Sequence, residues 1–551
     1  MAKIKALLNK NKKVIFEIVA ILIIALFSYS LAPKTLQNDT FYTIPIGNLI
    51  MENGIDMKDH FSWHEDLPYT YPHWLYDVIM AKIYNFGGWN AIYSSVCVLS
   101  IFMGILIYEV NRKLNKNQII SFLITIGAMY LLKSYIAARA QLVTFIIYIG
   151  VIYFIEKFLQ NPKKIIYAIG IICSSILIAN LHIAVWPFFF VVFLPYIAEY
   201  FIAILSDIII YKKINIFIKK RQLKKYKNDN EKLEKINNSL NEIFETNKKV
   251  EEYRKTQNKY KIRIEKNKNV KWLILIMIIC IGTGLLTPLG TNPYTYLIKT
   301  MQGNTTKNIN EHLPLTLIND TEILCTIVIL VATLTFTKVK IRLSDLFMIG
   351  GLTYLMFFSK RQSTMFVIFG SIILNRLLIE CIDIYGIKES LKKKVNNFFK
   401  IGFIVLGMCL IAIFSFDNIY NNRNRPFVSE NTYPVKAADW ILENLDINNI
   451  KLFNEYNYGS YLIFKGIPVF IDSRADLYAP EFNGRTDDIF MEFINTSGIG
   501  KFYGNTFKNY GITHVIVYKN SKMSMIIDNA DRENYNKIYS DDSFVIYEII
   551  K

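Results

Sequence analysis

The sequence predicts a multi-pass α-helical membrane protein with about eleven transmembrane helices and a C-terminal α/β domain outside the cytoplasm. Three observations carry this prediction. The 551 residues are 52% hydrophobic and only 20% charged, with a mean hydropathy of +0.26. The apolar residues come in runs of about 17–25, which is the length that crosses a bilayer core. The last part of the chain lacks such runs and instead shows short strand patterns beside an amphipathic helix pattern.

The apolar runs define the candidate spans and their orientation. They lie at 14–32, 91–111, 117–134, 141–157, 164–181, 186–210, 272–289, 322–337, 343–359, 362–381 and 400–416. The first run follows a basic N-terminus and could be a signal peptide, but its length and the flank LAPKTLQND favour an uncleaved helix. With the N-terminus in the cytoplasm, every cytoplasmic loop is rich in Lys or Arg: 112–116, 156–164, 212–271, 338–342 and 388–400. We therefore expect a plasma-membrane protein whose C-terminal domain is extracytoplasmic. One span more or fewer would place that domain in the cytoplasm.

The hydrophilic segments complete the predicted domain organisation. Residues 1–416 form the transmembrane domain, which contains a long first outer loop at 33–90 and a charged cytoplasmic insert at 211–271; residues 417–551 form the α/β domain. In the insert, apolar residues recur at helical spacing, which predicts a charged amphipathic helix or a helical hairpin. A solvated spacer and a partner-binding coiled coil both fit that pattern.

The α/β domain is predicted from five short patterns. We expect a helix at 435–445, strands at 451–453, 468–472 and 513–518, and a terminal hairpin at 536–549. None of the six cysteines lies in this region, so no disulfide framework is expected.

The net charge of +18 does not indicate a nucleic-acid partner, because about +12 of it lies between residues 212 and 271, flanked by two spans. Charge placed in this way is a topology feature and favours attraction to anionic lipid headgroups.

Polar residues gather at the predicted outer ends of the spans. They include Arg139, Gln141, His182 and Arg361. Ionisable groups near bilayer depth are costly and tend to mark functional sites. Arg139 and Arg361 suit bidentate contacts to a phosphate, although snorkelling to outer headgroups would also explain each of them.

The first outer loop carries the other candidates. Asp39 follows the first span closely, so it lies near the membrane surface, where it could act as a general base or merely cap a helix. The loop continues with His60, His64, Glu65 and His73 among aromatic side chains. The aromatic side chains could stack on a sugar or anchor the loop at the membrane interface. A metal site at His60, His64 and Glu65 matches no strong motif. In the α/β domain, Asp472, Arg474 and Asp476 follow a predicted strand and could bind a ligand, or form an internal Arg–Asp pair.

The chain resembles the GT-C class of membrane glycosyltransferases, which take sugars from polyprenyl-phosphate or polyprenyl-diphosphate carriers at the outer face. The matching layout has a cytoplasmic N-terminus, an acidic residue early in the first outer loop, interfacial helices and an outer α/β domain. More narrowly, it resembles a group of bacterial membrane proteins through NDTFYTIPIGNLIMENG, HFSWH, YPHWLYD, ARAQLVTF, ANLH, TPLGTNPY, KRQSTMF and EYNYGSYLIFKGIPVFIDSRADLY. It departs from the class in lacking the oligosaccharyltransferase signature and an Asp-x-Asp pair after the first span.

The resemblance implies an inverting glycosyltransferase with a lipid-linked sugar donor and a glycan, lipid or protein acceptor. Asp39 takes the place of the catalytic carboxylate, and Arg139, Arg361, His182 and Gln141 would hold the donor phosphate. His60, His64, Glu65, His73, Asp472 and Arg474 would contact sugar or acceptor. The missing second carboxylate favours a mechanism without a metal cofactor. The rival functions are a scaffold protein of cell-envelope glycan synthesis, a lipid or polysaccharide transporter, and a ligase of lipid-linked glycans.

Overall fold

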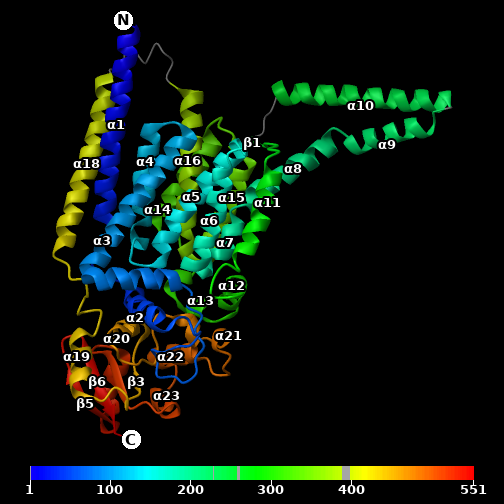
Figure 1. Ribbon diagram of the computed structural model, residues 1–551. Helices are drawn as coiled ribbons and strands as arrows, with labels where there is room; N and C mark the ends of the chain where they lie inside the picture. The colour runs from blue at the N-terminus through cyan, green and yellow to red at the C-terminus, as the bar shows by residue number, and fades with distance from the viewer. Residues whose placement is uncertain (1, 228, 257–260, 387–396, 551) are drawn as a thin grey trace.

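The structure is a computed structural model that describes residues 2–227, 229–256, 261–386 and 397–550. It is mostly helical. Long helices run side by side, and a small part with a β-sheet lies beyond one end of them, as Figure 1 shows. A helical hairpin projects sideways near the other end.

The helices of the first part are α1 (Ala2–Leu31), α2 (Asn38–Asn53), α3 (Trp74–Asn115), α4 (Gln118–Leu132), α5 (Ala140–Gln160), α6 (Ile165–Leu181), α7 (Trp186–Val191), α8 (Leu194–Ile210), α9 (Lys213–Lys225) and α10 (Asn230–Thr256). There follow α11 (Val270–Thr283), α12 (Asn292–Gln302), α13 (Thr305–Asn308), α14 (Thr321–Phe336), α15 (Leu343–Phe358), α16 (Ser363–Tyr385) and α18 (Asn397–Arg423). The two-residue strands β1 (Ile262–Arg263) and β2 (Ile341–Arg342) pair in parallel.

The membrane character of the bundle is clear in the described residues. Seven helical segments are long and apolar enough to cross a bilayer: Lys13–Leu31, Trp74–Asn115, Gln118–Tyr135, Ala140–Gln160, Ile183–Ile210, Lys360–Tyr385 and Gly402–Arg423. Four shorter apolar helices are α6, α11, α14 and α15. The eleven predicted spans all fall on these helices, and a count of eleven crossings stays a prediction. Of the basic loop expected at 388–400, residues 388–396 lie outside the described part.

The first loop forms the layer between the bundle and the C-terminal part. α3 is broken at Gly87 and Gly88, where Gly88 has a φ of 58° that favours glycine. The part of α3 before the break packs against α2. Gly47 permits this close approach, because a Cβ there would clash with the backbone carbonyl of Asp77. The loop therefore contains two packed helical segments, α2 and the first part of α3, in agreement with the interfacial helices of the class that the chain resembles.

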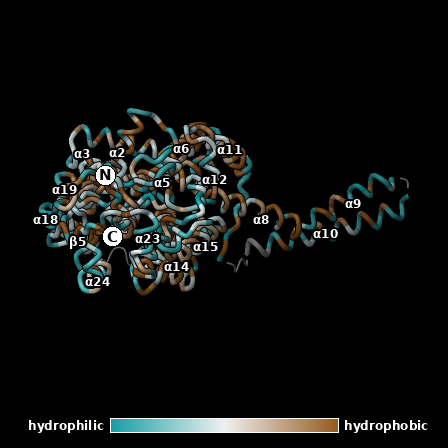
Figure 2. The backbone as a smooth tube through the Cα atoms, turned by 90° about the horizontal axis from the view of Figure 1, so that it is seen from below, coloured by the Kyte–Doolittle hydropathy of each residue, from teal (hydrophilic) through white to brown (hydrophobic). Residues whose placement is uncertain are grey.

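The insert forms the helical hairpin that was one of the two predicted outcomes. α9 and α10 lie side by side, and Figure 2 shows them extending away from the bundle. Leu240 and Ile243 of α10 are buried against α9, which accounts for the apolar spacing in the sequence.

The C-terminal part contains a four-stranded sheet in the order β3-β4-β6-β5. Its strands are β3 (Leu452–Phe453), β4 (His514–Tyr518), β5 (Tyr535–Ser540) and β6 (Phe544–Ile549); β3 is parallel to β4 and the other pairs are antiparallel. Its helices are α19 (Val435–Asn444), α20 (Tyr456–Phe464), α21 (Pro480–Asn483), α22 (Ile489–Ser497), α23 (Tyr503–Tyr510) and α24 (Lys522–Ala530). α18 continues past residue 416 to Arg423, and the domain boundary near 417 stays a prediction.

The strand predicted at 468–472 is wrong. Val469 makes only one isolated bridge, to Ser62 of the first loop. The amide side chain of Asn454 takes the place of a neighbouring strand: its oxygen accepts from the Phe470 N–H (2.9 Å) and its nitrogen donates to the Ile471 carbonyl (2.7 Å). The apolar run is buried as expected, but the backbone groups of Phe470 and Ile471 make hydrogen bonds to a side chain and not to a neighbouring strand.

A buried ion pair also ties the first loop to the C-terminal part. Arg474 lies 2.6 Å from Asp59 and 2.7 Å from Asp472, and its side chain is only 2% exposed. We expect Arg474→Met to destabilise the protein by about 3–5 kcal/mol, because two buried carboxylates lose their partner. Thermal unfolding of the purified protein in detergent measures this effect.

The matched control is Arg485→Met, which removes an exposed arginine whose partner Asp487 is also exposed. We expect its stability to stay within about 0.5 kcal/mol of the parent. An equal loss of thermal stability in both variants would show that the buried ion pair contributes no more than an exposed one.

A second charged cluster lies inside the bundle at the end of α5 away from Arg139, about 25 Å along that helix. Arg342 contacts Glu156 (2.5 Å) and Asp345 (2.7 Å), and Arg376 contacts the same two carboxylates (3.3 and 2.5 Å). Buried charges therefore also lie at the ends of the helices away from the C-terminal part, in addition to the polar residues predicted at the outer ends. These four charges balance one another, and three of them, Glu156, Asp345 and Arg376, line a space of only about 10 Å³.

Candidate functional site

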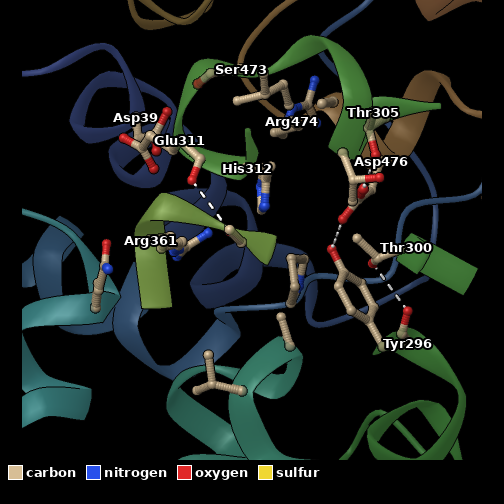
Figure 3. A pocket seen from close by; sticks show the side chains of 18 of the residues that line it. Asp39, Tyr296, Thr300, Thr305, Glu311, His312, Arg361, Ser473, Arg474 and Asp476 are labelled. Carbon is tan, nitrogen blue, oxygen red and sulfur yellow. Dashed lines mark hydrogen bonds between the residues drawn. The ribbon is translucent and has the colours of Figure 1, made fainter. Parts of the chain in front are cut away.

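A cavity of about 1200 Å³ lies where the ends of the bundle helices meet the C-terminal part. It is lined by residues of both parts and of the first loop. Figure 3 shows Asp39, Glu311, His312 and Arg361 toward one side, and Tyr296, Thr300, Thr305 and Asp476 toward the other. Cavities of this size accommodate ligands larger than a drug-sized molecule.

Asp39, Arg139 and Glu311 form a chain of charges along one wall. Asp39 is in the first turn of α2, Arg139 directly precedes α5, and Glu311 lies in the short 3-10 helix Asn310–His312. The Arg139 guanidinium is 2.5 Å from the Asp39 carboxylate and 2.8 Å from that of Glu311. Burial lowers the pKa of Arg139, but these two carboxylates raise it above its ordinary value overall. Arg139 is therefore a fixed cation that orients both acids.

Arg361 lines the cavity without an acidic partner among the described residues, whereas Arg139 and Arg474 are ion-paired; Lys307, the other lining cation without one, is exposed. It lies in the 3-10 helix Lys360–Gln362 between α15 and α16, and the Lys360 N–H donates to the Leu313 carbonyl (2.8 Å), which holds this turn against the loop of Glu311. In the described part of the chain, no carboxylate lies within ion-pair distance of Arg361, while the neighbouring Lys360 pairs with Asp320 at 2.9 Å. A guanidinium exposed only to a cavity is suited to bind an anion.

The cavity histidines are neutral at physiological pH. His182 shares a hydrogen bond with Thr144 (3.1 Å), and its ring centroid is 4.9 Å from that of His73. Burial, followed by the charge of Arg361, lowers the pKa of His73 to about 3 and that of His312 to about 4. Burial and then His73 lower the pKa of His182 as well. These rings can offer hydrogen bonds without adding charge.

Glu455 is the carboxyl group of the cavity whose charge changes near neutral pH. It immediately precedes α20, and burial raises its pKa to about 7. The adjacent Tyr456 carbonyl accepts a hydrogen bond from the Asn38 side chain (2.8 Å), which brings this turn next to Asp39. Carboxyl groups in a cavity whose pKa is strongly shifted by burial occur often at catalytic and binding sites.

The opposite wall and the flank differ in character. Asp476 accepts a hydrogen bond from the Tyr296 hydroxyl (2.6 Å), and burial raises the pKa of Asp476. The flank formed by the bundle helices is apolar, with Phe188, Val191, Leu355, Phe358 and Met365 among its lining residues. The cavity thus combines a polar chamber with an apolar side that lies among membrane helices.

The structure brings seven of the eleven predicted site residues to this cavity or its rim. Asp39, Arg139, Gln141, His182, Arg361, His73 and Arg474 line it. The other four lie elsewhere: His60 pairs with Asp56 (2.7 Å), and His64 packs under Phe470 and binds its carbonyl (2.8 Å). Glu65 is exposed outside the cavity, and Asp472 is fully buried against Arg474. The contacts proposed for these four with sugar or acceptor have no support from their positions.

Sequence reasoning missed Glu311 and Glu455 as site residues, whereas Asp476, expected beside Asp472 and Arg474, does line the cavity. Glu455 opens the segment EYNYGSYL, which had already been singled out. Glu311 and His312 are two isolated titratable residues in a polar loop, which is a weak signal. Among the residues described, no group of three or more His, Cys, Asp or Glu side chains is arranged to hold a metal ion.

Of three comparisons with known proteins, the one with solved structures finds similar folds. A scan against protein-family models finds no match, and neither does a search of curated proteins. Among solved structures, the chain is similar to the oligosaccharyltransferase of Archaeoglobus fulgidus in its apo form, with a TM-score of 0.54 and 10% identity over 91% of this chain and 69% of that one. It is also similar to ArnT from Cupriavidus metallidurans bound to undecaprenyl phosphate, with a TM-score of 0.48 and 9% identity over 97% and 98%. The chain therefore shares the fold of the Archaeoglobus fulgidus oligosaccharyltransferase, which is the GT-C fold predicted from the sequence.

Proposed function

We propose that the chain is a membrane glycosyltransferase that moves a sugar from a polyprenyl-phosphate or polyprenyl-diphosphate carrier to an acceptor at the outer face of the plasma membrane. The observation that carries this proposal is the convergence of Asp39 and the unpaired Arg361 on one cavity with an apolar flank. A carrier lipid has the same division, since it joins a charged phosphate to an apolar chain. In this proposal the N-terminus is cytoplasmic and the C-terminal part is outside.

The proposed chemistry is an inverting displacement at the anomeric carbon. An acceptor hydroxyl attacks that carbon from the face opposite the carrier, and its proton passes to the Asp39 carboxylate. The bond between the anomeric carbon and the phosphate oxygen breaks, and the carrier phosphate leaves with the electron pair. Arg361 stabilises the negative charge that develops on the leaving phosphate. Arg139 already pairs with both Asp39 and Glu311, so it holds Asp39 in place and is not free to bind the phosphate.

The remaining cavity residues take supporting roles in this proposal. Gln141, two residues after Arg139, and His182, beside His73, are both buried. In this proposal they supply hydrogen bonds to the donor without adding charge. Arg474 is held by Asp59 and Asp472, so it shapes the cavity and does not bind a free anion.

The experiment that tests the function is a transfer assay with the purified protein in liposomes. A panel of radiolabelled polyprenyl-phosphate and polyprenyl-diphosphate sugars is supplied with extracted envelope glycans, lipids and proteins as acceptors. We expect label to move from the carrier to one acceptor class. If no carrier sugar is consumed while the protein still binds the carrier, a scaffold function is the better explanation.

Glu455 gives the proposal a pH dependence. Below about pH 7 its carboxyl is protonated, and above that pH it is an anion that accepts a stronger hydrogen bond from an acceptor hydroxyl. We therefore expect transfer to rise as the pH passes upward through about 7, mainly through a lower KM for the acceptor. Steady-state kinetics from pH 5.5 to 8.5, a range of about three units around neutrality, measures this rise.

The control for this effect is Glu455→Gln, which keeps the shape of the side chain and cannot ionise. We expect its profile to lose the inflection near neutral pH. The three cavity histidines with lowered pKa values cannot replace it, since they are already neutral there. An unchanged inflection in the variant would assign the titration to another group.

A further inference from the structure

The hairpin of α9 and α10 projects from the bundle at the end away from the C-terminal part (Figure 1), whereas the cavity is lined by residues of that part. It is anchored at its base. The chain turns at Lys212, whose φ of 47° is left-handed, and the side chain of Asn247 in α10 donates to the Tyr211 carbonyl (3.0 Å). Lys213 and Lys266 both pair with Asp207 near the end of α8. The hairpin therefore leaves the bundle in a defined direction, next to the end of a membrane helix.

The two helices of this hairpin carry very different charge. α9 contains five lysines, one arginine and no acidic residue in its 13 residues. α10 contains equal numbers of acidic and basic side chains in its 27 residues. The positive charge of the hairpin is thus concentrated on α9 and is not neutralised by the helix that packs against it.

The exposed side of α9 is both apolar and basic. Ile216 and Leu223 are partly buried toward α10, whereas Ile214, Phe217 and Ile218 are 59%, 65% and 47% exposed on the other side. At 100° per residue, Arg221 and Lys225 project from this same exposed side. Long basic side chains around an apolar stripe are the composition of a helix that lies in a membrane interface.

The exposed apolar stripe of α9 continues a lipid-facing surface. Leu205 and Ile209 of α8 are 55% and 72% exposed, and they lead along the chain to Ile214 and Phe217. α8 belongs to one of the helical segments long and apolar enough to cross a membrane. In Figure 1, α10 lies on the side of α9 that is farther from the C-terminal part, so α9 faces back toward the level of the bundle helices.

We propose that α9 is an interfacial helix that binds the anionic lipid headgroups of the membrane surface at this end of the bundle, and that α10 covers its other side. The apolar side chains enter the boundary of the acyl chains, and the lysines and Arg221 contact lipid phosphates. The proposal fixes the hairpin parallel to the membrane and does not depend on the function of the cavity.

The test uses the full-length protein in nanodiscs with a photoreactive p-benzoylphenylalanine in place of Phe217. The matched control replaces Glu245, which lies on the face of α10 away from the buried Leu240 and Ile243. After irradiation, mass spectrometry counts lipid adducts. In discs of phosphatidylcholine with one third phosphatidylglycerol, we expect at least about fivefold more lipid adduct at position 217 than at 245, as the depth of an interfacial helix implies. Ile214, one turn away, serves as a second labelled position.

The charge requirement is tested in the same discs. Replacing Lys220, Arg221, Lys224 and Lys225 by Gln should lower the adduct yield at position 217 severalfold, toward the yield in pure phosphatidylcholine. Equal lipid adducts at 217 and 245, or adducts at 217 to protein only, would overturn the proposal. Since adduct formation needs no transfer activity, its failure is distinct from failure of the proposed glycosyltransferase function.

Discussion

Asp39→Asn is expected to reduce transfer by roughly 100-fold to 10,000-fold, which is the range that a positioned general base contributes. The substitution keeps the size of the side chain but removes its ability to take a proton. Arg139 keeps its second partner, Glu311, at 2.8 Å, so the wall of the cavity retains its main ion pair. The loss should therefore appear in kcat rather than in protein yield or thermal stability. Transfer of labelled sugar in liposomes measures it.

Asp56→Asn provides the matched control, because Asp56 lies in the same loop but pairs with His60 outside the cavity. We expect it to retain activity within about threefold, as for surface changes away from a site. Full transfer by Asp39→Asn would exclude Asp39 as the base and would direct attention to Glu455.

Arg361→Gln is the second change with a large expected effect. Removing the unpaired cation leaves the departing phosphate without its main electrostatic partner, and loss of one such group typically costs about 100-fold to 1,000-fold in rate. Arg361 also binds the donor before reaction, so we expect a higher KM for the carrier-linked sugar in addition to a lower kcat. Because Arg361 has no acidic partner among the described residues, its removal should not strand a buried carboxylate.

Lys360→Gln is the control for charge at this turn. Lys360 adjoins Arg361 in sequence but pairs with Asp320 and does not line the cavity. If both variants lose activity equally, the effect comes from the local fold of the turn. If Arg361→Gln keeps its affinity for the donor, the carrier phosphate binds elsewhere.

The sequence was sufficient to predict the membrane class, the positions of the apolar helices and the grouping of Asp39, Arg139 and Arg361. Each of these depends on local information: the length of an apolar run, the sign of the charge at its ends, or the distance of a residue from a span. Arg139 and Arg361 lie at helix ends that the topology assigns to one side, so their shared location required no knowledge of packing.

Which of these groups form ion pairs could not be predicted from such local information. Whether Arg139 is free to bind phosphate depends on Glu311, which is far away in sequence and reaches it only because the loop of Glu311 packs against the turn of Lys360. The cluster of Glu156, Arg342, Asp345 and Arg376 was missed for a related reason. Glu156 and Arg342 lie in loops whose basic residues indicated the topology, and Asp345 and Arg376 lie within predicted spans, whereas the fold brings all four together as balanced pairs.

The most direct measurement is an experimental structure of the full-length protein in nanodiscs with undecaprenyl phosphate added. The convergence of Arg361 and Asp39 on one chamber predicts that the phosphate lies within about 3.5 Å of the Arg361 guanidinium, with the isoprenoid chain along Phe188, Leu355 and Phe358 and with Asp39 open to the same chamber. A phosphate bound at another surface, with Arg361 contacting only protein groups or water, would contradict the proposed donor site.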